Sequence, residues 1–137
     1  MMKAQNILAD FIERIKADEY FGDIRVTRAY PDTVKPTLLK KAVVAVGIKS
    51  IDIDENSIGQ DIKAGSYSVF SNIYVPYFFD KRAMEQIVFR ICRDISDLNI
   101  VAIEISKISA NSVAECFVMK AVFTFNDNLS FGDDDNE

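Results

Sequence analysis

The sequence predicts an α+β domain in which two helices pack on one face of an antiparallel or mixed five-stranded sheet, in the order α-β-β-β-α-β-β. Two stretches carry apolar residues at steps of three and four, as an amphipathic helix does, and the other stretches largely alternate, as half-buried strands do. Three strands in succession, and later two, favour antiparallel hairpins, and the apolar stripes of both helices can be buried against the resulting sheet.

The clearest helix is expected over residues 80–98. Its apolar residues form one stripe: Met84, Ile87, Val88, Ile91, Ile95 and Leu98. Asp80 is placed to cap the N-terminus of this helix, and Asn99 follows its last turn. Its charged residues include Arg90 and Asp94, four positions apart, which we interpret as a solvent-exposed pair. Because none of its side chains suggests catalysis, we expect this helix to be scaffold that lies across the sheet.

The N-terminal half of the chain contains the other helix and two strands. The helix is expected over residues 4–20, and the strands over residues 23–29 and 41–53. Within the second strand the apolar residues change parity, which predicts a β-bulge or bend at residues 47–50.

The following strand, residues 64–79, carries two aromatic residues on its otherwise polar face. Residues 54–63 ahead of it are polar and rich in turn formers, so we expect an exposed, mobile loop there. Phe70 and Tyr74 interrupt the polar face. Either a helix end or loop of the same chain covers them, or they form an exposed contact patch for a partner.

The C-terminal part predicts a β-hairpin with arms at residues 100–108 and 113–125, joined by turn-favouring residues 109–112. Both faces of the last strand are largely apolar. They are therefore either both covered within the monomer, or one of them is covered by another subunit. Residues 1–126 are expected to form a single domain, and residues 127–137 an acidic, disordered tail.

Charge and composition argue against several classes of partner. Apolar residues make up 49% of the chain, which predicts a compact core, and the net charge of −5 argues against nucleic-acid binding through the phosphate backbone. No apolar run approaches the ~20 residues of a membrane-spanning helix, and no signal peptide is evident. Cys92 and Cys116 are too few for a disulfide framework. We expect a cytoplasmic protein with no membrane partner.

The sequence nominates no catalytic residue, cofactor site or metal site. It contains no histidine, which removes the usual general base near neutral pH, and its glycines form no phosphate-binding loop. Residues 52–63 resemble a calcium loop only superficially, since Ser57 and Lys63 occupy the positions of the turn glycine and the bidentate glutamate. The expectation is that this protein is not an enzyme.

The layout of the whole chain resembles that of the tail terminator proteins of long-tailed bacteriophages and prophages. The resemblance lies in the order and length of the elements, the long polar loop 54–63, the aromatic-rich strand ending VPYFFD, and the helix-to-hairpin passage ending FVMKAVFTF. It contains no short diagnostic motif. Members of that family are small α+β proteins that form a hexameric ring at the head-proximal end of the tail tube, stop tube polymerisation and offer a docking surface for the head.

This resemblance implies a structural virion protein without a substrate. It implies a homo-oligomer, hexameric in the assembled tail, whose partners are the tail tube protein and head-tail connector proteins. Such a protein would be cytoplasmic during assembly and would then reside in the virion tail. Contacts in such a ring are expected to involve the polar loop, the two aromatics and the two-faced last strand: Ile58, Ile62, Phe70, Tyr74, Val118, Lys120 and Val122. The alternatives are another head-tail joining or tail completion protein, and a small-molecule-binding α+β domain.

Overall fold

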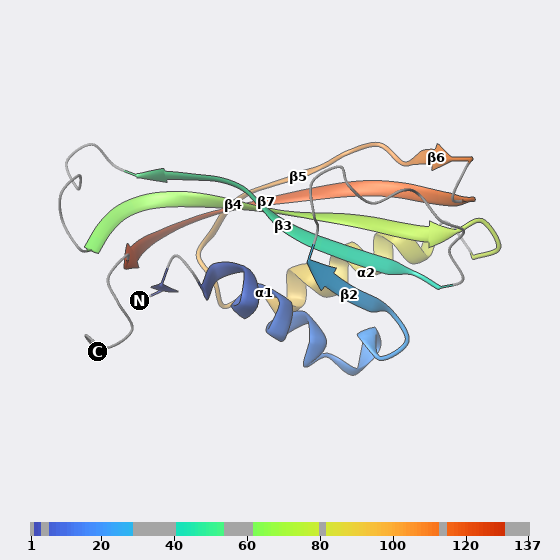
Figure 1. Cartoon of the computed structure of the whole chain (residues 1–137), viewed down its shortest axis with the longest axis horizontal. Helices are drawn as coiled ribbons and strands as arrows, with labels where there is room; N and C mark the ends of the chain where they lie inside the picture. The colour runs from blue at the N-terminus through green and yellow to red at the C-terminus, as the bar shows by residue number, and fades with distance from the viewer. Residues whose placement is uncertain are drawn as a thin grey trace.

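The computed structural model describes residues 2–3, 6–28, 41–53, 62–79, 82–112 and 115–130 (Figure 1). The elements in chain order are β1 (Met2–Lys3), α1 (Ile7–Lys16), the 3₁₀ helix η2 (Glu19–Phe21), β2 (Arg25–Arg28), β3 (Val43–Ile53), β4 (Ile62–Pro76), α2 (Arg82–Asp94), β5 (Ile100–Ile105), β6 (Ser109–Asn111) and β7 (Cys116–Ser130).

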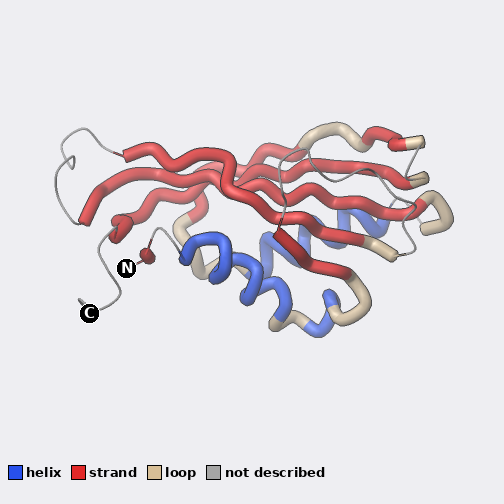
Figure 2. The backbone as a smooth tube through the Cα atoms, viewed as in Figure 1, coloured by secondary structure: helices blue, strands red, loops and turns tan. Residues whose placement is uncertain are grey.

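Within these residues the strands form one mixed sheet. Its main order is β1-β7-β4-β3-β2, and β5 and β6 pair with the edge of β7 that faces away from β4. Strands β2 and β3 are parallel, as are β1 and β7, and the other pairs are antiparallel. Both α-helices lie on the same face of this sheet (Figure 2). The predicted α+β class, with two helices on one face of the sheet, is confirmed.

The number and order of the strands differ from the prediction, because the sheet has seven strands rather than five. The added strands are β1, which is two residues long, and β6, which occupies most of the predicted turn at residues 109–112. Turn-favouring residues form a strand here because they still pair in register with β7, from Ser109 opposite Val118 to Asn111 opposite Cys116. The chain reverses just after β6, and Glu115 has a positive φ of 50° there.

The helices cover the core with the stripes that the sequence predicts. Five of the six predicted stripe residues are at most 2% exposed, although the helix ends at Asp94, short of the predicted residue 98: Met84, Ile87, Val88 and Ile91 in α2, and Ile95 just after it. Helix α1 contributes Phe11, whose ring centroid lies 5.7 Å from that of Phe123 on β7. Tyr67 on β4 stacks on Phe125 at 4.9 Å. Aromatic rings from one helix and two strands therefore form the centre of the core.

The predicted irregularity in β3 is also confirmed. Its pairing with β4 shifts between Ile48 and Ser50, within the predicted interval. The bulge lets the strand place apolar residues toward the helices on both sides of the irregularity.

Charged residues of α2 pair with the N-terminal part of the chain, which corrects the expected pair within the helix. Arg90 donates two hydrogen bonds to the Asp18 carboxylate, at 3.0 and 2.7 Å, and its guanidinium lies 5.1 Å from the centroid of the Tyr20 ring. Arg14 on α1 donates to both Asp10 and Asp97. The Arg90–Asp18 bonds fasten α2 to the segment just before η2, whereas the Arg14–Asp97 bond, which joins α1 to the turn after α2, is exposed at the surface.

Strand β7 extends beyond the predicted end of the domain. Residues 127–130, the first part of the predicted tail, pair with residues 62–65 of β4. Residues 131–137 and the predicted loop residues 54–61 lie outside the described residues.

Candidate interaction surfaces

The sheet turns one face toward the helices and presents the opposite face, here called the outer face, on the other side. Alternation along β4 and β7 assigns each residue to one face, because successive side chains of a strand point to opposite sides. Tyr67, Val69, Ile73 and Val75 are at most 2% exposed beneath the helices. Their sequence neighbours therefore lie on the outer face.

Five of the seven predicted contact residues come together on this outer face. Phe70 is paired with Val122, and Tyr74 with Val118, while Lys120 lies between these pairs opposite Asn72. Phe70, Tyr74, Val118 and Val122 are half-buried, and Lys120 is exposed. Of the other two predicted residues, Ile62 belongs to β4 and pairs with Ser130, and Ile58 lies outside the described residues.

Neighbouring groups of the sheet itself partly cover Phe70. A Cβ atom placed on Gly47 of β3 would lie 2.4 Å from Cζ of Phe70, so the ring occupies the space that the missing side chain leaves. The Nζ atom of Lys120 lies 4.9 Å from the centroid of the same ring, within the range of a cation–π interaction. Neither a helix end nor a loop is needed to explain why Phe70 is half-buried.

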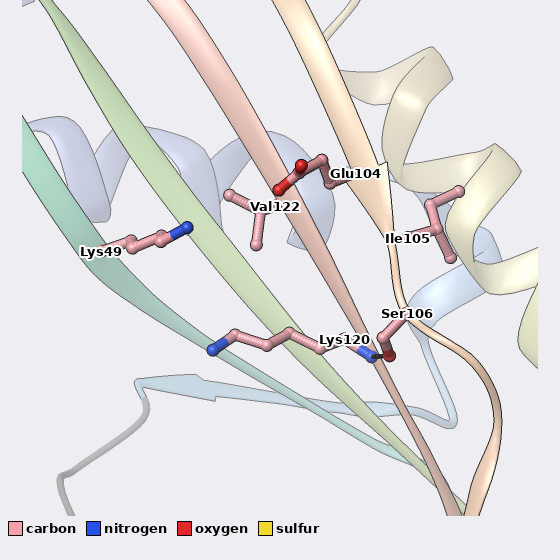
Figure 3. A pocket seen from close by; sticks show the side chains of 6 residues that line it. All are labelled: Lys49, Glu104, Ile105, Ser106, Lys120 and Val122. Atoms are coloured by element: carbon pink, nitrogen blue, oxygen red, sulfur yellow. Dashed lines mark hydrogen bonds between the residues drawn. The ribbon is translucent and has the colours of Figure 1, made fainter.

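A shallow hollow of about 580 Å³ opens beside this ring. It is lined by Lys49, Glu104, Ile105, Ser106, Lys120 and Val122. In Figure 3 the ammonium group of Lys49 points toward Val122 and the Glu104 carboxylate lies next to Val122, whereas the Lys120 side chain extends away from Ser106 across β4. The backbone of Ser106 donates to the Lys120 carbonyl at 2.9 Å, which holds the rim against β7. Two ammonium groups and one carboxylate suit polar contacts with another protein surface.

An exposed aromatic cluster lies at the end of β4, where the chain turns toward α2. Phe78 and Phe79 are 73% and 37% exposed, and their ring centroids are 5.0 Å apart. Tyr77 packs against Phe117 of β7 at 4.9 Å. The predicted contact residues do not include this cluster, although the sequence YFF at residues 77–79, just before the second helix, signals it.

Strand β5 carries a further exposed apolar surface, which the predicted contact residues do not include either. Val101, Ile103 and Ile105 are 52%, 42% and 50% exposed, and Ile108 just beyond the strand is 38% exposed. Ile103 and Ile105 pair with Phe123 and Ala121, both fully buried on the helix-covered face. Their large exposed fractions show that the helical layer does not extend fully beneath this edge strand. The alternation of residues 100–105 showed an apolar face but not its lack of cover.

The titratable groups with shifted pKa values lie mainly in the helical layer. The hydrogen bonds from Arg90 hold the pKa of Asp18 well below its usual range. Burial, and then the neighbouring Asp18 carboxylate, raise the pKa of Asp94 to about 6. Oδ2 of Asp94 is buried and has no hydrogen-bond partner among the described residues. Arg90 links Asp18 with α2, so we interpret this cluster as a structural connection.

Other chemistry finds little support among the described residues. Burial raises the pKa of the Cys92 and Cys116 thiols, which makes both poorer nucleophiles at neutral pH. Within the described ranges, no group of three or more His, Cys, Asp or Glu side chains is arranged to hold a metal ion. None of the described helices is both long and apolar enough to span a membrane.

Comparison with known proteins identifies a similar fold. No protein-family model matches the chain, and no curated protein matches its sequence. Among solved structures, the chain is similar to one from "Virion of native gene transfer agent (GTA) particle", with a TM-score of 0.50 and 14% sequence identity. The match covers 89% of this chain and 94% of that chain. At this identity the likeness shows a shared fold over nearly the full length of both.

Proposed function

We propose that this protein is a structural component of a phage-type virion. It would act as a tail terminator, forming a ring that caps the tail tube and joins it to the head. The observation that carries this proposal is the likeness of 89% of the chain to a chain from a gene transfer agent virion. The order and length of the sequence elements also resemble those of phage tail terminators.

The surfaces of the molecule support an assembly role. A ring of identical subunits needs two different patches on each subunit, because every contact joins one patch to the other. The outer face, the Tyr77–Phe79 cluster and the β5 surface supply apolar and charged groups outside the core. Large exposed apolar patches on a folded domain mark contact sites. The proposed partners are further copies of this chain, the tail tube protein and a head-tail connector protein.

In this proposal the protein has no substrate and needs no cofactor. It assembles in the cytoplasm and remains in the tail of the finished particle. The predicted contact residues Phe70, Tyr74, Val118, Lys120 and Val122 would meet a partner through the outer face.

The decisive experiment is to delete the gene from the genome that encodes it and to examine the particles by electron microscopy. Loss of a terminator leaves tube polymerisation unchecked, so overlong tails without heads are expected, and expression of the wild-type chain in trans should restore uniform length. Headless tails of normal length would contradict the terminator role and indicate a different head-tail joining role. Intact particles with normal tails would contradict both.

A further inference from the structure

We propose that the two opposite edges of the sheet bind each other between copies of this chain, head to tail. The first is the β5 edge, made of β5 together with the flank of α2 that bears Glu85 and Phe89. The second is the β2 edge, residues Arg25–Arg28. This deepens the proposed function and rests on it for closure into a ring, but pairing of the two edges is a property of the chain itself.

The β5 edge has features that favour pairing with another strand. Among the described residues, β5 pairs only with β7, so the backbone groups of its other side are available for a further ladder. Ile103 and Ile105 are 42% and 50% exposed on the helix-covered side. Edge strands in natural proteins usually carry charges at such positions to prevent association. The apolar residues at these positions indicate an edge that another chain covers in the assembled state.

Helix α2 extends this apolar edge into the helical layer. Glu85 and Phe89 are four residues apart and share one side of the helix, whereas Arg90 on another side contacts Asp18, the N-cap of η2. Helix α1 contacts β2 and β3, whereas α2 contacts β4, so α2 lies on the side of α1 that is nearer to β5. The flank of α2 that faces away from α1 is therefore turned toward β5. Phe89 is 68% exposed. A second copy placed beside β5 would therefore also cover Phe89.

The charges on the two edges are complementary. The β5 edge carries one carboxylate on each side of the sheet: Glu104 pairs with Val122 of the outer face, and Glu85 lies in the helical layer. The β2 edge carries one guanidinium on each side. Arg25 pairs with Val43, on the outer side, and Arg28 pairs with the core position Val46. All four charged residues are outside the ion pairs found among the described residues.

The directions of the strands also fit, and their levels meet at the end of β5. Strand β3 is antiparallel to β4, and β4 to β7, so β2, β3 and β7 all run the same way, whereas β5 runs opposite to β7. Copies related by rotation about an axis parallel to the strands would therefore pair β5 with β2 in an antiparallel ladder. Followed across β3 and β4, strand β2 lies level with residues 118–121 of β7. At that level the edge of the sheet runs from Ile105 at the end of β5, which pairs with Ala121, to Ser109 at the start of β6, which pairs with Val118.

These features identify a second copy of this chain as the occupant. The β5 edge is apolar and acidic and the β2 edge is basic, and both belong to the same molecule. Joining the β5 edge of one copy to the β2 edge of another leaves the pair with one free β2 edge and one free β5 edge. Such a heterologous contact extends in one direction, and it closes only where the rotation between copies allows a ring.

The test reverses the charges of one edge at a time. One variant carries Glu85→Arg and Glu104→Arg, and the other carries Arg25→Glu and Arg28→Glu. Self-association of the wild-type chain is measured by sedimentation and native mass spectrometry up to millimolar concentration. Each reversal places like charges across the contact, so the dissociation constant should rise at least about tenfold. Mixing the two variants in equal amounts should restore association, because each then meets an opposite edge.

Two controls separate edge pairing from general effects of charge or folding. Glu13→Arg reverses a charge on the exposed surface of α1 away from the sheet, and should leave the dissociation constant unchanged. Ile105→Lys places a charge on the β5 edge at an already half-exposed position, and should abolish association while the thermal melt stays cooperative. A wild-type chain that is monomeric at millimolar concentration, or an oligomer unaffected by both reversals, overturns the edge pairing. Neither result removes the proposed terminator role, which depends on tail length.

Discussion

The two faces of strands β4 and β7 differ far more than their sequences suggest. Toward the helices, Val69, Ile73 and Phe123 are fully buried. On the outer face, Phe70, Tyr74 and Val122 are residues of comparable size and apolar character, yet they are only half-buried. The difference comes from where the helices lie. An apolar residue on such a strand can therefore be assigned to the core or to a contact surface only when it is known whether the helices cover that face of the sheet.

The largest expected effect tests this comparison directly. Phe123→Ala removes a fully buried ring that contacts Phe11, and should lower the free energy of unfolding by about 3–5 kcal/mol. Val122→Ala, its neighbour on the outer face, should cost about 1 kcal/mol or less, because it is already half-exposed. Urea denaturation of both variants measures the difference. Similar losses would mean that the outer face is as much a part of the core as the inner one.

A second prediction concerns Asp94, a partly buried carboxyl group in the helical layer whose pKa is raised. The pKa of Asp94 in the folded state is about 6, above the 3.8 of an ordinary aspartate, so folding favours its protonated form. This contribution to stability is fully present below pH 3.8 and is lost as the pH rises through about 6. The pKa of Asp18 is shifted the other way, so its contribution is present above pH 3.8 and is lost in acid.

Asp94→Asn should therefore be more stable than the wild type at pH 7 and no more stable at pH 4. We expect a gain of about 1 kcal/mol at pH 7, less than the pKa shift would give in a dry site, because Asp94 is partly exposed. Urea denaturation from pH 4 to pH 8 measures the gain. A difference that does not vary with pH would show that the Asp94 proton is not linked to folding.

The smallest expected effect concerns the outer face itself. Gly47→Ala places a Cβ where the Phe70 ring lies, so the ring must swing toward solvent and leave Lys120. The net cost should be about 1 kcal/mol or less, since alanine also reduces the freedom of the unfolded chain. In a double-mutant cycle with Phe70→Ala, the two changes should be non-additive by about 0.5 kcal/mol or more. Additive effects would show that the Gly47–Phe70 contact contributes nothing.

Sequence patterns were sufficient for features that depend on local periodicity. The stripe of α2, the bulge in β3 and the face assignments of β4 follow from the spacing of apolar residues, and the structure has all three. Spacing also placed Phe70 and Tyr74 on one face of β4. Their meeting with Val118 and Val122 depends on the register between β4 and β7, which no local pattern contains.

Other features could not be predicted because they join distant parts of the chain. Arg90 pairs with Asp18, 72 residues away, although Asp94 stands at the spacing typical of a helical ion pair. Likewise, the alternation in β5 showed an apolar face but not that this strand lies at an edge of the sheet, beyond the cover of α2. Strand order is a property of the whole fold, and the exposure of Ile103 and Ile105 follows from it.

The position of β7 in the chain has a consequence for how the protein folds. This strand follows every other described element, yet β1, β4, β5 and β6 all pair with it. Its pairing with β1 joins Met2 to Leu129, contacts nearly the whole length of the chain apart. Such long-range contacts require large loops to close before they stabilise anything, which slows folding. Until β7 has been synthesised, β4 lacks the strand with which it pairs from Ile62 to Pro76, so a nascent chain would expose an unpaired strand edge to its surroundings.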